Sequence, residues 1–89
     1  MRVKKLKQIL AEKQSFPYLI TDLNNIKYLT GYSGSNAYLV IDEKTSYFIS
    51  DSRYEEYVRS LLPKNFEFIL QTGSTSDALK ICYDKIKKK

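Results

Sequence analysis

The chain has 89 residues, which suits one small domain of modest stability, and 43% of them are apolar, enough for a folded core. A single cysteine, Cys82, excludes an internal disulfide and a cysteine-based zinc site and suits a reducing compartment. No apolar run approaches the ~20 residues that span a bilayer, and the basic start lacks the apolar segment of a signal peptide. We therefore expect a cytoplasmic protein with no membrane partner.

The net charge of +5 is concentrated at the two ends of the chain. Residues 2–13 carry +4 and residues 77–89 carry +3, whereas the middle carries −2. The two basic ends either bind an acidic partner or are the solvated lysine faces of two amphipathic helices. The helical spacing and the lack of interleaved aromatic residues favour solvated faces. We therefore expect no nucleic-acid partner, because any such binding should be weak and lost near ~150 mM salt.

The first half of the chain predicts two helices and three strands. Apolar residues at helical spacing indicate a helix over 2–14, and "FPYLIT" indicates a short edge strand because Pro17 has no N–H to donate. Asp22 caps a short helix that Gly31 ends. "AYLVI" and "SYFIS" predict a β-hairpin with a four-residue loop.

The second half adds a helix, a strand and a last helix. "SDSRYEEYVRSLL" is the clearest helix, with Ser52 and Glu55 as an S-x-x-E capping box and Pro63 as its end. Its predicted buried stripe is Tyr54, Tyr57, Val58, Leu61 and Leu62. "FEFILQ" is a strand, Gly73–Ser76 is a turn with capping hydroxyls, and the last helix is expected to bury Leu79, Cys82, Tyr83 and Ile86.

The resulting order, α-β-α-β-β-α-β-α, predicts a mixed α/β fold with a β-sheet flanked by helices. In such folds a helix that follows a strand usually crosses over to another strand. No strand follows the last helix here. We therefore expect either that the sheet ends at this point or that the domain is truncated before its last strands.

The stretch "NNIKYLTGYSGSNAYLVI" holds two of the three glycines, Gly31 and Gly34. A dinucleotide fingerprint needs a strand before its glycines and a helix after them, and here that order is inverted. No Lys-Ser/Thr pair follows, which excludes a P-loop. Local evidence therefore predicts a structural helix-to-strand turn, with Gly31 at the helix C-cap.

Two ordered blocks of this sequence resemble the N-terminal domain of the creatinase/prolidase/aminopeptidase P family. "NIKYLTGYSGS" matches the pattern N-I-x-Y-L-T-G-aromatic-x-G-S, and Asp51, Arg53 and Tyr54 match D-x-R-Y after an apolar strand. The resemblance covers nearly the whole chain, and the loop looks most like that of Xaa-Pro aminopeptidase. It implies a ribonuclease-H-like domain that precedes a larger "pita-bread" metallopeptidase domain.

The resemblance also implies a parent enzyme, a hydrolase that releases the N-terminal residue before proline. Its second domain holds two divalent metals, manganese or cobalt, through two Asp, one His and two Glu. That catalytic domain is absent from residues 1–89, so we expect a non-catalytic N-terminal domain fragment. The expected partners are its own catalytic domain, a second subunit in a homodimer, and proline-containing peptides at the active-site entrance. A prolidase (Xaa-Pro dipeptidase), or a stand-alone interaction module of the same fold, is the alternative.

The candidate entrance or domain-interface residues are Arg53, Tyr54 and the loop Tyr32, Ser33, Gly34, Ser35 and Asn36. We expect the loop to be exposed, with Tyr32 as an aromatic platform for a proline ring and the polar side chains as partners for a peptide backbone. A purely structural turn is the alternative. Arg53 either forms a structural ion pair with Asp51 or contacts a partner domain or substrate, and Tyr54 needs a partner for its hydroxyl if it is buried.

The residue types also limit the chemistry of the chain. It has no histidine, so it has no imidazole base and no Ser-His or Cys-His nucleophile pair. Asp22, Asp42, Asp51 and Glu55 could in principle hold two magnesium ions for a nuclease, but caps and a hairpin loop account for these positions. Cys82 lies on the apolar face of the last helix, where a small buried side chain is expected.

We predict that the purified 89-residue chain hydrolyses no Xaa-Pro peptide, because no histidine is available to complete a metal centre. The measurement is release of the N-terminal residue in manganese or cobalt, with a proline aminopeptidase as the positive control. Activity that stays with the protein through a second column would contradict this prediction.

Overall fold

The computed structural model describes residues 3–87, and its elements follow the predicted order α-β-α-β-β-α-β-α. Arg2, Lys88 and Lys89, which contribute to the two basic ends, lie outside the described residues. The elements are α1 (Lys4–Glu12), β1 (Tyr18–Ile20), α2 (Leu23–Thr30), β2 (Tyr38–Ile41), β3 (Ser46–Ser50), a 3-10 turn η1 (Ser52–Tyr54), α3 (Glu55–Leu61), β4 (Phe66–Leu70) and α4 (Thr75–Lys87).

The four strands form one mixed sheet in the order β1-β2-β3-β4. β2 pairs antiparallel with both β1 and β3, whereas β3 and β4 are parallel, with Ser50 opposite Leu70. Parallel neighbours need a crossover, which η1 and α3 supply here. The C-terminal ends of β3 and β4 and the N-terminal end of β2 therefore meet at one end of the sheet.

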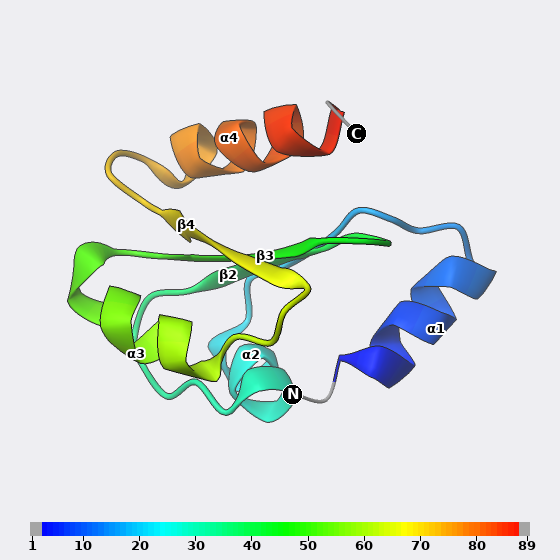
Figure 1. Ribbon diagram of the computed structural model, residues 1–89, viewed down its shortest axis with the longest axis horizontal. Helices are drawn as coiled ribbons and strands as arrows, with labels where there is room; N and C mark the ends of the chain where they lie inside the picture. Colours follow the sequence, from blue (N-terminus) through cyan, green and yellow to red (C-terminus); the bar gives the residue numbers. More distant parts are fainter. Residues whose placement is uncertain (1–2, 88–89) are drawn as a thin grey trace.

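Helices cover both faces of this sheet (Figure 1). α1, α2 and α3 lie on one face, above a core of alternating strand residues such as Leu39, Ile41, Phe48 and Phe68. α4 lies alone on the other face, where its Ala78 and Cys82 pack against Val40, Tyr47, Ile49 and Ile69. This arrangement confirms the predicted α/β fold and the predicted burial of Cys82, which is 1% exposed.

The helix after β3 begins differently from the prediction. Asp51, not Ser52, is the cap: its carboxylate accepts the backbone N–H of Arg53 at the start of η1. α3 begins only at Glu55, whose side chain pairs with Arg59 at a distance of 3.0 Å. The predicted Ser52/Glu55 capping box is therefore wrong. Ser52 lies in the 3-10 turn η1 and Glu55 begins α3, so the two residues do not share the first turn of one α-helix.

Two predicted buried tyrosines are exposed. Tyr83 on α4 is 53% exposed, and it lines an open groove together with Leu19 of β1 and Val40 of β2. Tyr57 on α3 is 39% exposed, and within the predicted α3 stripe Val58 is the residue that is fully buried. No helix within residues 3–87 combines the length and the apolar character needed to cross a membrane.

Candidate functional site

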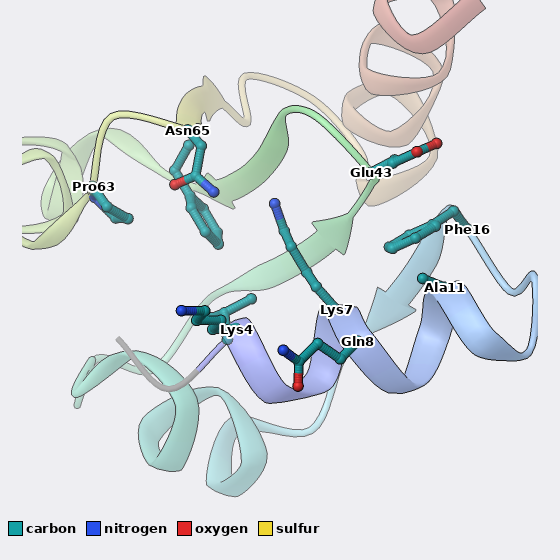
Figure 2. Close-up of a pocket in the computed structure, with 10 residues that line it drawn as sticks. Lys4, Lys7, Gln8, Ala11, Phe16, Glu43, Pro63 and Asn65 are labelled. Atoms are coloured by element: carbon teal, nitrogen blue, oxygen red, sulfur yellow. The ribbon is translucent and has the colours of Figure 1, made fainter.

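The two ends of the sheet differ in chemistry. At the end with the β2–β3 turn, a pocket of about 530 Å³ opens between α1 and the start of β4 (Figure 2). Its floor is apolar, and Lys4, Lys7 and Glu43 supply the charges at its rim. None of the residues predicted as site candidates line this pocket. They gather at the opposite end, where β3 and β4 finish and the loop 31–37 leads into β2.

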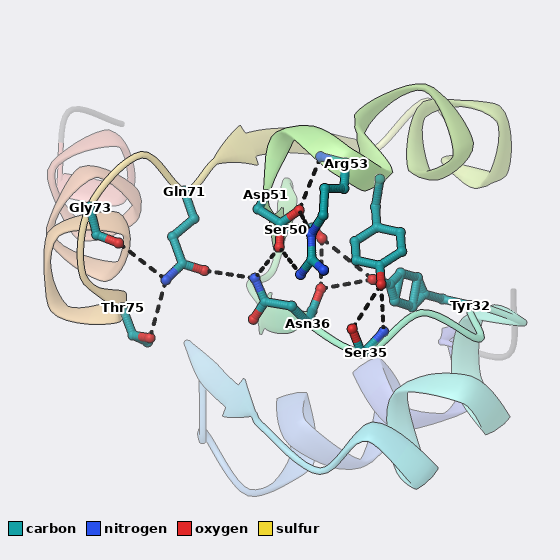
Figure 3. Close-up of polar contacts among 10 residues, drawn as sticks. Tyr32, Ser35, Asn36, Ser50, Asp51, Arg53, Gln71, Gly73 and Thr75 are labelled. Atoms are coloured by element: carbon teal, nitrogen blue, oxygen red, sulfur yellow. Dashed lines mark hydrogen bonds and ion pairs between the residues drawn. The ribbon is translucent and has the colours of Figure 1, made fainter.

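A polar network joins the loop to the ends of both parallel strands (Figure 3). We define it as Asn36 from the loop, Ser50 and Asp51 from the end of β3, Arg53 from η1, and Gln71 from the end of β4. Chain order predicts this meeting in outline, since parallel strands end on the same side of a sheet. Hydrogen bonds between these side chains hold the network together.

Asp51 is the anionic centre of the network. Its carboxylate accepts hydrogen bonds from Arg53 Nε at 3.0 Å and Nη2 at 2.9 Å, from the Arg53 backbone N–H at 3.0 Å, and from Asn36 Nδ2 at 2.8 Å. These donors, first the Arg53 side chain and then Asn36, hold the pKa of Asp51 well below its usual range. The predicted ion pair between Arg53 and Asp51 is therefore confirmed.

Asn36 connects the loop to the ends of two strands, β3 and β4. Its side-chain amide donates to Asp51 and, at 3.2 Å, to Oε1 of Gln71. Its backbone carbonyl accepts the hydroxyl of Ser50 at 2.6 Å and that of Tyr32 at 2.8 Å. The bonds to Ser50, Asp51 and Gln71 fix the loop relative to the sheet, and the bond from Tyr32 closes the loop on itself.

Tyr32 is buried, which corrects the prediction of an exposed aromatic platform. Its side chain is 1% exposed, and its ring lies 5.1 Å from that of Phe48, 5.6 Å from that of Tyr54 and 5.7 Å from that of Tyr57. Burial raises the pKa of its phenol. Aromatic side chains bury large areas, so Tyr32 anchors the loop in the core rather than offering a surface to a ligand.

Tyr54 and Tyr57 hold the two loop serines from the side of α3. The Tyr54 hydroxyl lies 2.8 Å from Oγ of Ser35 and accepts its backbone N–H at 3.3 Å, and these bonds lower the pKa of the Tyr54 phenol. The Tyr57 hydroxyl makes the equivalent pair of contacts with Ser33, both at 3.3 Å. The Tyr54 hydroxyl therefore has the hydrogen-bond partner that we expected for a tyrosine at this position.

The two loop glycines have different structural roles. Gly31 is the αL C-cap of α2, with φ of 82°, as predicted. Gly34 lies against the side chain of Tyr32, so that a Cβ atom at this position would overlap the Tyr32 hydroxyl and ring. Glycine is therefore required at position 34, because the packed side chain of Tyr32 leaves no room for a Cβ atom there.

Sequence reasoning missed several features of this site: Ser50 and Gln71 were not proposed, Tyr57 was assigned to the buried stripe of a helix, and Asp51 was proposed as the partner of Arg53 but not of Asn36. Ser50 and Gln71 carry a usable signal, because each stands at the C-terminal end of one of two strands that the crossover makes parallel. Tyr57 carries none, since its spacing is that of an ordinary core position.

The exposed groups of the site are hydroxyls and a cation. Ser33 and Ser35 are exposed, and the side chain of Arg53 is 65% exposed while its guanidinium carbon lies 5.0 Å from the Tyr54 ring centroid. These groups offer hydroxyls, an amide and a cation. Within residues 3–87 no three His, Cys, Asp or Glu side chains gather as a metal ion would require. In the part of the chain that the structure describes, the site brings hydroxyls and a cation together without an imidazole base beside them.

These features define a small α/β domain with a braced polar loop at one end of its sheet, and its sequence places it in a known family. The family model described as the creatinase/prolidase N-terminal domain matches residues 2–89. The chain belongs to this family.

Individual relatives agree with that assignment. An uncharacterized peptidase, YqhT, from Bacillus subtilis is 35% identical over 74 residues, which are 83% of this chain and 21% of the peptidase. The structure of an Xaa-Pro aminopeptidase from Streptococcus pyogenes is 30% identical with a TM-score of 0.82, covering 98% of this chain and 64% of that one.

A more distant structure is that of an X-prolyl aminopeptidase from Caenorhabditis elegans, described as a cytosolic enzyme with a di-nuclear active site. It is 27% identical with a TM-score of 0.56, covering 83% of this chain and 15% of that one. This chain thus spans less than two thirds of each of these three proteins.

We predict that Gly34→Ala lowers the free energy of unfolding by about 1–3 kcal/mol, the usual cost of overpacking, because Tyr32 is held on three sides and cannot retreat. Gly73→Ala is the matched control, since a Cβ there meets only the flexible carboxylate of Asp77. Urea unfolding measures both. If the two variants have the same free energy of unfolding, Tyr32 can move aside for the added Cβ atom and the prediction is wrong.

We also predict a pH signature for Asp51. Its folded-state pKa lies below the ordinary value of about 4, so its bonds stabilise the fold above that pH and are lost as the pH falls towards the folded pKa. The free energy of unfolding should therefore fall more steeply between about pH 5 and pH 2 in the wild type than in Asp51→Asn. Arg53→Gln should flatten the same region. Urea titrations at fixed pH give the slopes, and parallel curves would refute the assignment.

Proposed function

We propose that this chain is the non-catalytic N-terminal domain of an Xaa-Pro aminopeptidase and that its loop 31–37 shapes the entrance to the active site. The observation that carries the proposal is the bracing of this loop. Its backbone is fixed by Asn36 and Tyr32, yet Ser33 and Ser35 remain exposed. A loop that is rigid and still presents hydrogen-bonding groups is suited to positioning a peptide, because little conformational entropy is lost on binding.

The catalytic part of the enzyme is proposed to be a second domain. This chain matches 21% of the length of a peptidase and 15% of that of an X-prolyl aminopeptidase with a di-nuclear site, which supports the proposal. The two metals, manganese or cobalt, would be held there, since the described residues of this chain offer no ligand cluster. Asp, His and Glu codons at metal-ligand spacing beyond Lys89 in the reading frame would support the proposal, and a stop codon directly after Lys89 would contradict it.

The proposed partner of the loop is the active-site mouth of the neighbouring subunit in a homodimer. Arg53 supports this role, because one face of its guanidinium is satisfied by Asp51 while its side chain remains largely exposed. A cation whose orientation is already fixed can meet a carboxylate of a peptide or of the partner domain at a small entropic cost.

We predict that Ser35→Ala in the complete enzyme lowers kcat/KM for longer Xaa-Pro peptides by several-fold and leaves the melting temperature and the dimer unchanged. Ser35 is exposed and lies at the loop, so its removal affects contacts with the peptide more than the core. Ser15→Ala, on the segment between α1 and β1, is the control because it lies at the other end of the sheet. Replacing Tyr32 is unsuitable, since a buried anchor would be lost.

Two results would speak against the entrance role. If Ser35→Ala leaves kcat/KM unchanged for every peptide length, the loop is a structural turn only. If activity falls in step with stability, the effect belongs to folding. A preference for dipeptides over longer peptides would favour a prolidase, which shares this domain family.

A further inference from the structure

The pocket between α1 and the start of β4 is a second candidate binding site, and it lies at the end of the sheet opposite loop 31–37 (Figure 2). Its volume of about 530 Å³ falls within the range of about 300–1,000 Å³ that is usual for small-molecule sites. Such sites combine apolar walls with a few polar groups that orient the ligand. Because the loop contributes no residue to this pocket, the properties of the pocket are independent of the function proposed for the loop.

The walls of the pocket suit an apolar body. Phe66 of β4 and Val3 before α1 are 9% and 5% exposed and belong to the hydrophobic core, so the pocket reaches the edge of that core. Phe16 packs on the same core and stands at one end of the pocket in Figure 2. Aromatic rings pack well against other flat apolar groups, so these walls favour a ligand that carries a ring or a similarly compact apolar group.

The charges of the lining residues favour an anionic head on that body. Lys4 and Lys7 on α1 contribute +2 and Glu43 in the β2–β3 turn contributes −1, which gives the lining a formal charge of +1. In Figure 2, Lys7 extends from α1 and Asn65 from the start of β4 towards the space between these two elements. A carboxylate in that space can accept hydrogen bonds from an ammonium group and from an amide N–H₂ group.

The balance of charges also limits the class of ligand. A dianion such as a phosphate monoester would place a second negative charge near Glu43, and a cation would be repelled by two lysines. We propose that this pocket binds a small monocarboxylic acid whose remaining part is a compact apolar group. Its carboxylate meets Lys4 and Lys7. Its apolar group lies against Phe16 and Phe66.

The probes are 3-phenylpropionate, 3-phenylpropanamide and 3-phenylpropylamine, which share one apolar body and differ in charge. Each is titrated into the ¹⁵N-labelled 89-residue chain, where amide shifts report both the place and the strength of binding. We expect 3-phenylpropionate to give shifts that saturate below about 10 mM and centre on α1, Glu43 and Phe66. The amide should bind at least about threefold more weakly, and the amine more weakly still, because neither carries the charge that the lysines attract.

Single substitutions test each charge, at about 0.15 M salt so that distant charges are screened. Lys4→Gln and Lys7→Gln should each weaken binding of 3-phenylpropionate by about two- to fivefold, the usual strength of an ion pair near the surface. Glu43→Gln should strengthen binding by a similar factor, because it removes the lining carboxylate. Lys5→Gln and Lys44→Gln are the matched controls: these lysines do not line the pocket, and binding should stay within about 1.5-fold.

A pair of bulky substitutions tests the apolar part of the pocket. Ala11→Trp should abolish binding, because Ala11 lines the pocket and an indole at this position would occupy it. Ile9→Trp is the matched control: Ile9 is 43% exposed on α1 and does not line the pocket, so binding should stay within about twofold. The melting temperature of each variant shows that it is folded, and the lysine variants decide the question if Ala11→Trp is not.

Three results would overturn the proposal. The first is the absence of saturable shifts up to about 10 mM 3-phenylpropionate. The second is equal binding of the acid, the amide and the amine, which would make the pocket an apolar surface without selectivity. The third is a set of shifts centred away from the lining residues, or binding that the lysine variants leave unchanged. None of these results bears on loop 31–37, whose role the Ser35→Ala enzyme tests separately.

Discussion

The hydrogen bonds to the Asp51 carboxylate are the interaction on which the polar end of this domain depends. This carboxylate stands where β3 stops, and it is at once the cap of η1, the partner of the Arg53 guanidinium and the acceptor for Asn36. Hydrogen bonds to a charged group are stronger than neutral ones, so one ionised side chain fixes the direction of the chain after the strand, the position of a cation and the loop before β2. The mixed sheet supplies the condition for this, because its parallel pair brings these segments to one end.

Much of the fold could be read from the sequence because each element carries a local signal. Pro17, Asp22, Gly31 and Pro63 mark boundaries through their own backbone requirements, and the structure places elements at those boundaries. The start of α3 was misjudged because S-x-x-E is a pattern of spacing alone. Asp51 one residue earlier competes for the same backbone N–H groups, and in the structure it caps η1.

The site was harder to predict than the fold, because its contacts join residues far apart in the chain. The family resemblance located the loop, but it could not show that Tyr32 turns inward. The outcome depends on Phe48, Tyr54 and Tyr57, which come from three other elements and together form the cavity that the ring fills. Tyr83 shows the opposite error: helical spacing predicts burial, but Tyr83 lies at an open groove beside Leu19 and Val40, and spacing does not report how closely a helix packs on a sheet.

The bond from Asn36 to Gln71 spans 35 positions, and that from Asn36 to Asp51 spans 15. Contacts of such separation close large loops and form only when the intervening segments have already found their places. The conformation of loop 31–37 therefore depends on the ends of both β3 and β4, which are distant from the loop in the chain. A chain that ended before Gln71 would hold the residues of the loop without the bond that joins Asn36 to β4, so the shape of the loop requires the complete four-stranded sheet.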